Sequence, residues 1–220
     1  MERIDPSVYP WARRFEKIWN TYVRLPLLRQ GSLSAAYWEK QSVGDPHGPD
    51  KFVAMDPLSP PLLEDVAARL SGPDSPVLDL GCNAGRNLSA LFQKGFKNLH
   101  GVDVQREAFE HMKRVFPEMH AAARLHQATY QAYLPTVADG AFDVVYSQAA
   151  VEFVSPAFPL VRHLARIARR AVVLLVNEGG HNYPRLWEVE FARSRFFLTK
   201  LLRPALAGEA VSLMVFRPAP

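Results

Sequence analysis

Residues 77–87 contain the pattern that says most about the fold: Val77-Leu78-Asp79-Leu80-Gly81-Cys82-Asn83-Ala84-Gly85-Arg86-Asn87. A short apolar run, typical of a buried strand, enters a turn with glycines, and a helical pattern follows. A second strand pattern, Leu99-His100-Gly101-Val102-Asp103, ends on a carboxylate about twenty residues beyond the turn. An α/β sheet holds a nucleoside with this order of elements, because glycine lets the backbone approach the ligand and the acid accepts hydrogen bonds from the ribose hydroxyls.

Two kinds of nucleoside cofactor compete for this turn. A dinucleotide fold requires G-x-G-x-x-G, so that a helix N-terminus can receive a pyrophosphate. Here Asn83 stands between Gly81 and Gly85, and Arg86 holds the place of the last glycine. The string resembles instead the apolar-Leu-Asp-Leu-Gly-Cys-Gly-x-Gly motif of class I S-adenosylmethionine (SAM)-dependent methyltransferases and departs from it only at Asn83. Asn tolerates a positive φ better than other residues with a Cβ, so we expect the turn to be retained.

The resemblance to that family extends over roughly residues 60–220. Residues 141–147, Ala-Phe-Asp-Val-Val-Tyr-Ser, are similar to the fourth strand of the family, whose end lies beneath the sulfonium. Residues 151–154, Val-Glu-Phe-Val, are similar to the segment that follows, where many members carry Glu-His. Phe153 replaces that histidine, which excludes a histidine base at this point.

The resemblance implies a role for several residues at the cofactor. Asp103 would hold the ribose, although it could serve only as a helix N-cap. Asp79 would orient the turn near the methionine amino group, or simply bond local backbone, and Ser147 would contact the methionine moiety. No acid follows the third strand to read adenine, so Thr129 or Gln127 can substitute, or the backbone alone reads the base. The set expected at the cofactor is Asp79, Gly81, Cys82, Asn83, Gly85, Asp103, Val104, Thr129, Tyr130 and Ser147.

Length and composition favour an ordinary globular protein. The chain has 220 residues, enough for one domain with an appended N-terminal piece, and a formal net charge of only +4. Its basic residues are dispersed in short pairs such as Arg169-Arg170, which favours solvated helix faces over a nucleic-acid surface. Cys82 is the single cysteine, so we expect no internal disulfide and no multi-cysteine metal cluster. We expect no metal site elsewhere in the chain either.

The chain shows no segment that would direct it to a membrane. Its start, Met1-Glu2-Arg3-Ile4-Asp5-Pro6, carries acidic residues and no apolar core of a signal peptide. The longest strongly apolar run, residues 171–176, is far too short to span a bilayer. We therefore expect a cytoplasmic protein without a membrane partner.

The pattern of elements predicts a capped α/β fold. Residues 1–56 are expected to form an N-terminal helical cap and loop, with aromatic residues at helical spacing, and residues 57–220 the SAM-binding core. In the core, strands and helices alternate, which predicts a mostly parallel sheet of seven strands with helices on both faces. The expected strands are 77–80, 99–103, 124–128, 142–147, 171–176, 195–202 and one from 210 onward. The expected helices are 34–41, 61–70, 85–94, 105–115 and 156–169. A short connection between the last two strands predicts an antiparallel hairpin.

Methyl transfer from a sulfonium requires little machinery beyond in-line positioning of the acceptor. A general base is needed only if the acceptor arrives protonated. Candidates at the carboxyl edge of the sheet are Glu152, Asn177, Glu178, His181 and Tyr183, each of which also has an ordinary structural explanation. Tyr37 and Trp38 are candidates for the lid or the substrate pocket, where an aromatic face near a sulfonium offers cation–π attraction.

Missing motifs disfavour several kinds of methyl transfer. Residues 147–150, Ser-Gln-Ala-Ala, stand where enzymes that methylate base amino groups carry Asn/Asp-Pro-Pro-aromatic. Methylation of cytosine C5 requires a thiolate, and Cys82 lies in the cofactor turn. Metal-assisted catechol methylation would require Asp ligands for a cation after the fourth and fifth strands. Ser147 and Asn177 stand in those places instead.

The sequence thus predicts a SAM-dependent methyltransferase that acts on a small molecule, with the attacked atom and the oligomeric state left open. One alternative keeps the cofactor but changes the chemistry, because a sulfonium attacked by its own amino or carboxylate group gives cyclase or lyase activity and releases methylthioadenosine. A second alternative is a domain that binds SAM without catalysis.

Overall fold

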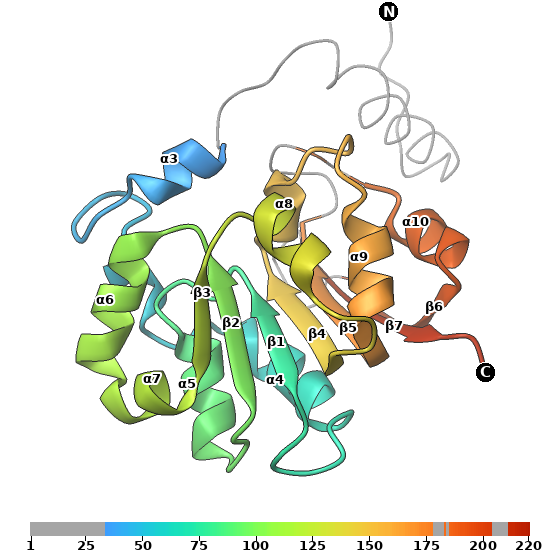
Figure 1. Ribbon diagram of the computed structural model, residues 1–220, viewed down its shortest axis with the longest axis horizontal. Coiled ribbons are helices and arrows are strands. Elements are labelled where there is room, and N and C mark those ends of the chain that lie inside the picture. The colour runs from blue at the N-terminus through green and yellow to red at the C-terminus, as the bar shows by residue number, and fades with distance from the viewer. Residues whose placement is uncertain (1–33, 178–182, 184, 204–210) are drawn as a thin grey trace, which may run out of the picture.

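The computed structural model describes residues 34–177, 183, 185–203 and 211–220. The first part of the predicted cap, up to residue 33, therefore lies outside the described residues, as do the candidates Glu178 and His181. Figure 1 shows the described chain as a central sheet with helices packed on its faces and the short helix α3 above one end of the strands.

The sheet has seven strands in the order β3-β2-β1-β4-β5-β7-β6. The strands are β1 Val77–Leu80, β2 Leu99–Asp103, β3 Arg124–Gln127, β4 Phe142–Gln148, β5 Ala168–Val176, β6 Phe196–Leu202 and β7 Ser212–Pro218. The first five strands are parallel, and β7 runs antiparallel between β5 and β6. The predicted mostly parallel sheet with a C-terminal antiparallel hairpin is confirmed.

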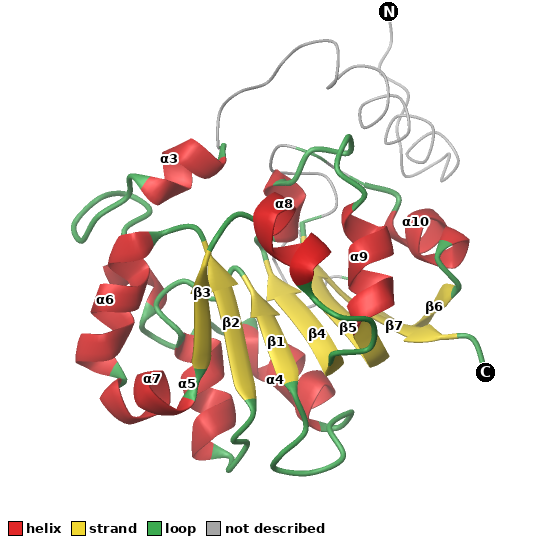
Figure 2. Cartoon of the chain, in the orientation of Figure 1, coloured by secondary structure: helices red, strands yellow, loops and turns green. Residues whose placement is uncertain are grey.

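Both faces of the sheet are covered (Figure 2). On one face lie α4 Ser59–Ala67, α5 Arg86–Gln93, α6 Arg106–Val115 and α7 Pro117–Ala122. On the other lie α8 Tyr130–Tyr133, α9 Leu160–Ile167 and α10 Trp187–Arg193. The alternation in β5 shows why two layers form: Val172 and Leu174 pack into one core, while Val173 and Leu175 pack into the other.

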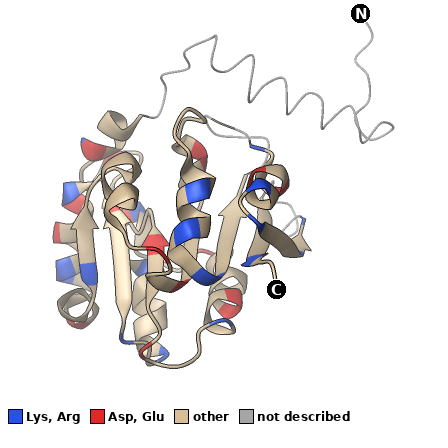
Figure 3. Cartoon of the chain, turned by 45° about the vertical axis from the view of Figure 1, so that its right-hand side comes forward, with Lys and Arg blue, Asp and Glu red and all other residues tan. Residues whose placement is uncertain are grey.

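The short elements lie in the connections. They are α3 Ala35–Glu39 and the 3₁₀ turns η2 Pro49–Phe52, η3 Leu134–Thr136 and η4 Val151–Phe153. Lysine and arginine residues are spread over the elements and interleaved with acidic residues (Figure 3). No helix among the described residues is both long enough and apolar enough to cross a membrane.

The boundaries differ from the predicted ones mainly around α9. The predicted helix 156–169 extends too far at both ends, because α9 begins at Leu160 and the chain is already in β5 at Ala168. Ala168 pairs with Phe142 of β4, and Arg169 donates a hydrogen bond to Asp143, so pairing with the neighbouring strand decides this boundary. The helices α7, α8 and α10 are not among the predicted elements.

The order of strands places a crevice in the middle of the sheet. Strand β1 pairs with β2 on one side and β4 on the other, so the connections leave β1 and β4 in opposite directions. In open α/β sheets, ligands bind outside the carboxyl ends of the strands at such a switch point.

Candidate functional site

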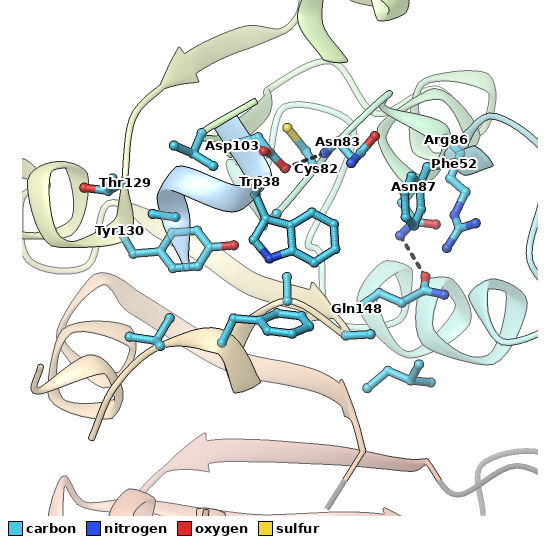
Figure 4. A pocket seen from close by; sticks show the side chains of 18 of the residues that line it. Trp38, Phe52, Cys82, Asn83, Arg86, Asn87, Asp103, Thr129, Tyr130 and Gln148 are labelled. Carbon is cyan, nitrogen blue, oxygen red and sulfur yellow. Dashed lines mark hydrogen bonds between the residues drawn. The ribbon is translucent and has the colours of Figure 1, made fainter. Parts of the chain in front are cut away.

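A cavity of about 260 Å³ lies at this switch point, above the carboxyl ends of the parallel strands. Its walls come from the turn after β1, the ends of β2, β3 and β4, η4, and the segment from α3 to α4 that covers the opening. Figure 4 labels ten of the lining residues, Trp38, Phe52, Cys82, Asn83, Arg86, Asn87, Asp103, Thr129, Tyr130 and Gln148.

The floor of the cavity is the glycine turn after β1. Gly81, Asn83 and Gly85 have φ angles of 80°, 42° and 82°. A Cβ at Gly81 would lie 2.4 Å from the Cβ of Ala150 and 2.8 Å from the hydroxyl of Tyr130, so only glycine fits there. Asn83 takes up the positive φ that the sequence predicted for it. Gly85 does not line the cavity.

Asp103 ends β2 beside this turn. Its Oδ2 accepts a hydrogen bond from the backbone N–H of Asn83 at 2.9 Å, and its Oδ1 accepts one from the N–H of Gln105 at 2.9 Å. Burial raises its pKa, while these backbone donors act in the opposite direction. Asp103 is not the N-cap of α6, which is Gln105. The carboxylate still has lone-pair capacity for a ligand hydroxyl.

Gln105 links the turn to the N-terminal segment. Its side chain is fully buried and accepts a hydrogen bond from Nδ2 of Asn83 at 3.0 Å. Its Nε2 donates to the backbone carbonyl of Gln41 at 2.9 Å. The chain just after α3 is thereby held against the turn that forms the floor.

Two further predicted cofactor residues, Asp79 and Ser147, do not line the cavity either. Asp79 is buried and accepts a hydrogen bond at Oδ2 from the hydroxyl of Tyr146 at 3.0 Å. Burial raises the pKa of Asp79 to about 7. Ser147 donates from Oγ to the carbonyl of Leu80 at 2.8 Å. These bonds join β1 to β4 and so support the floor; direct contact with a cofactor stays a prediction for both residues.

Val104, Ala128 and residues 129–131 line the end of the cavity beside β3. Thr129 is the N-cap of α8 and accepts a hydrogen bond from the N–H of Ala132 at 3.2 Å, whereas Gln127 is exposed and does not line the cavity. Burial raises the pKa of Tyr130 well above its usual value, which keeps its phenol protonated. The same cause raises the pKa of Cys82, which therefore remains a thiol.

A polar network that the sequence analysis did not identify closes the opposite end. Gln148 accepts two hydrogen bonds at Oε1, one from the hydroxyl of Ser59 at 2.9 Å and one from Nδ2 of Asn87 at 3.0 Å, the latter dashed in Figure 4. The Oδ1 atom of Asn87 is buried and has no hydrogen-bond partner among the described residues. An unmet buried acceptor beside a cavity points to a ligand that donates to it.

Arg86, next to Asn87, anchors the segment that covers this end. It lies 3.3 Å from Oδ2 of Asp56 and 6.0 Å from the centre of the Phe52 ring, and it donates to the carbonyl of Ala54 at 3.4 Å. Burial lowers its pKa, and the charge of Asp56 opposes that change. The pair of charges leaves this part of the cavity wall electrically neutral.

Of the two lid candidates, only Trp38 reaches the cavity. Its ring lies between the turn and η4 in Figure 4, with its centre 5.2 Å from that of Phe153. Its Nε1 is buried and has no hydrogen-bond partner among the described residues. Tyr37 points elsewhere and its hydroxyl hydrogen-bonds Nδ1 of His47 at 2.7 Å.

The structure brings three of the acid–base candidates together. Oε1 of Glu152 accepts a hydrogen bond from the N–H of Asn177 at 2.8 Å, and the N–H of Tyr183 donates to the carbonyl of Glu152 at 3.0 Å. Oε2 of Glu152 is buried without a partner in the described part of the chain, and burial raises the pKa of this residue to about 7. None of the three lines the cavity, but Ala150 and Phe153, close to Glu152 in the chain, do.

Within the described ranges, no group of three or more His, Cys, Asp or Glu side chains is placed to hold a metal ion.

Comparisons with known proteins agree with this architecture. Residues 77–171 match a family model described as a methyltransferase domain. A search of curated proteins finds no matching relative. The resemblance to class I SAM-dependent methyltransferases that the sequence predicts is confirmed by this match and by the order of the strands.

Solved structures with the same fold are distant in sequence. Geranyl diphosphate C-methyltransferase from Streptomyces coelicolor A3(2), solved with Mg²⁺, geranyl diphosphate and S-adenosylhomocysteine, is 14% identical, with a TM-score of 0.62 over 84% of this chain and 96% of that one. A SAM-dependent methyltransferase from Mesorhizobium loti is 16% identical, with a TM-score of 0.58 over 73% of this chain and 97% of that one. The [4+2]-cyclase SpnF is 13% identical, with a TM-score of 0.54 over 72% of this chain and 80% of that one. At such identities the likeness concerns the fold.

Proposed function

We propose that this protein binds SAM in the cavity above β1, β2 and β4 and transfers its methyl group to a small molecule. The observation that carries the proposal is Asp103, a carboxylate held by two backbone N–H groups beside a glycine turn at the switch point of the sheet. The S. coelicolor enzyme, which has the same fold, was solved with the demethylated cofactor S-adenosylhomocysteine (SAH).

The residues present fit this cofactor. Asp103 would accept from the ribose hydroxyls, and Val104, Thr129 and Tyr130 line the space for the adenosine end. The orphan Oδ1 of Asn87 would accept from a positively charged amino group, which supports placing the methionine end there. When bound, the cofactor supplies an electrophilic methyl group on a positively charged sulfur.

The work of the protein is then to position the acceptor and to exclude water. Trp38, Phe52, Phe153 and Leu175 give the remaining wall of the cavity an apolar surface, which supports a small acceptor that is largely apolar. Glu152 is the candidate best suited to receive a proton near neutral pH, because burial sets its pKa at about 7 and its Oε2 is unpaired within the described residues. The same bonds of Glu152 position the chain on both sides of residues 178–182.

The size of the cavity favours one alternative. A volume of about 260 Å³ lies below the range of about 300–1,000 Å³ typical of ligand sites. Little room therefore remains for an acceptor beside the cofactor unless α3 shifts. If the cofactor binds without an acceptor beside it, the alternative is intramolecular attack on the sulfonium, which would release methylthioadenosine.

Product analysis distinguishes these functions. Incubation with SAM and a panel of small acceptors should yield SAH together with a methylated acceptor. Methylthioadenosine formed without any acceptor would show that the protein catalyses cyclase or lyase chemistry and not methyl transfer. Tight binding of SAM with neither product, over the whole panel, would indicate a non-catalytic binding domain.

We also propose a cytoplasmic location, which the single buried thiol, Cys82, supports.

A further inference from the structure

A second hollow, of about 230 Å³, lies at the opposite edge of the sheet from the cavity. It is lined by Ala68, Arg69, Arg170 and Arg217, so three of its four lining residues are arginines. Arg69 follows the last turn of α4, Arg170 lies near the start of β5, and Arg217 lies near the end of β7. Because β7 runs antiparallel to β5, with Val172 paired to Phe216, Arg170 and Arg217 come to the same end of the two strands.

The positive charges around this hollow outnumber the negative ones. Asp65 of α4 is the acid beside it, and both of its oxygens are engaged: Oδ1 lies 2.7 Å from Nη1 of Arg69, and Oδ2 lies 2.7 Å from Nζ of Lys200. The side chains of Arg170 and Arg217 form no hydrogen bond or ion pair with any residue that the structure describes. The neighbouring Arg169, in contrast, has its own acceptor, Asp143, at 2.9 Å.

Three guanidinium groups around one hollow repel one another unless an anion lies between them. Arginine stays protonated at every physiological pH, so the repulsion cannot be relieved by loss of a proton. Its planar fork of N–H donors matches the oxygens of a phosphate, to which it forms two parallel charge-assisted hydrogen bonds. The bonds from Arg69 to the carboxylate and the carbonyl of Asp65 already fix the orientation of one of the three forks.

We propose that Arg69, Arg170 and Arg217 bind the phosphate group of a small phosphorylated molecule. The site is independent of the proposed cofactor cavity, which lies at the carboxyl edge of the parallel strands. Arg170 and Arg217 line one hollow together with Arg69, and this compact arrangement favours a small ligand over a nucleic-acid strand.

The test titrates inorganic phosphate into the full chain at constant ionic strength and follows binding by NMR and by the thermal midpoint Tm. We expect phosphate to raise the Tm and to shift backbone resonances around Ala68 and Arg217. The double variant Arg170→Ala/Arg217→Ala should bind phosphate at least about tenfold more weakly, because it removes two of the three groups that would form charge-assisted hydrogen bonds to the phosphate. Without phosphate the double variant should be no less stable than wild type, because it removes repelling charges.

The matched control is Arg162→Ala/Arg193→Ala, which removes the same charge from exposed positions on α9 and α10. It should bind phosphate like wild type, and both double variants should bind SAH unchanged, which separates this site from the proposed function. If both double variants bind phosphate equally weakly, the effect is one of overall charge, and the proposal is overturned. It is also overturned if the wild-type protein does not bind phosphate. Tighter binding of a short single-stranded RNA than of phosphate, lost in Arg170→Ala/Arg217→Ala, would assign the hollow to nucleic acid instead.

Discussion

Gly81 is the residue of the turn with the least room for a side chain. Its φ of 80° disfavours an L residue by about 1–2 kcal/mol, and a Cβ would meet Ala150 and Tyr130. We therefore expect Gly81→Ala to destabilise the fold by at least about 1–2 kcal/mol in urea unfolding and to abolish SAH binding in calorimetry. Gly72→Ala is the control, since no heavy atom lies within 4 Å of a Cβ there. Wild-type affinity in Gly81→Ala would show that the turn does not form the floor.

Asp79 and Glu152 make stability depend on pH. Burial raises the pKa of both carboxyls to about 7, above their values in the unfolded chain, so the folded state binds more protons between about pH 4 and 7. The free energy of unfolding should therefore decline as the pH rises through this window. Asp79→Asn and Glu152→Gln should each flatten the decline in denaturant titrations at several pH values. The exposed Asp74→Asn should leave the pH dependence unchanged. An unaltered slope in both buried variants would contradict the assignment.

Among individual residues, those whose roles depend on near neighbours in the chain could be predicted from the sequence. Asn83 with its positive φ and Asp103 beside the turn belong to one strand–turn–helix–strand unit. Gln148 escaped prediction because its partners are remote: Ser59 is 89 residues away and Asn87 is 61 residues away. No local pattern marks such a network, and only the packing of α4 and α5 against β4 brings it together.

The helix α3 depends on tertiary contacts for its place. It has five residues, none of them buried, which is too short for a helix to be stable alone. Ala35 and Trp38 of this helix line the cavity, so we expect SAH to change the fluorescence of Trp38. Trp38→Phe should remove most of that change and weaken SAH binding by about threefold to tenfold, the effect of losing part of an apolar contact. Trp187→Phe, in the core, should keep the response to SAH. A full response in Trp38→Phe would place α3 outside the site.

Among the elements, the strands were more predictable than the helices. Apolar runs such as residues 77–80 and 142–147 matched β1 and β4 because strands buried on both faces have a continuous apolar signature. The predicted start of β5 at residue 171 was wrong because Ala168, Arg169 and Arg170 are compatible with a helix, and the pairing of this part of β5 with β4 is a long-range contact. The helix α10 lacks a clear start signal, since Leu186 at its N-cap provides no side-chain hydrogen bond.

For the whole molecule, the cavity joins parts of the chain that are far apart in sequence. The segment from Ala35 to Leu58 covers the ends of β1, β2 and β4, held there by Gln105 and Arg86. We expect SAH to slow amide hydrogen exchange in this segment as well as in the turn, because a bound ligand stabilises every element that closes on it. Mass spectrometry of exchange with and without SAH measures this. Protection confined to residues 80–87 would mean that the N-terminal segment takes no part in binding.

The most direct test of the proposed cofactor site is calorimetric titration of SAH into wild type and Asp103→Asn. The variant keeps the shape of the side chain but loses the charge that would bind the ribose hydroxyls. We predict binding by wild type and an affinity about tenfold to a hundredfold lower in Asp103→Asn, with Asp74→Asn indistinguishable from wild type. Circular dichroism establishes that each variant is folded. Equal affinity in wild type and folded Asp103→Asn, or no heat of binding with either SAH or SAM, would contradict the assignment of this cavity.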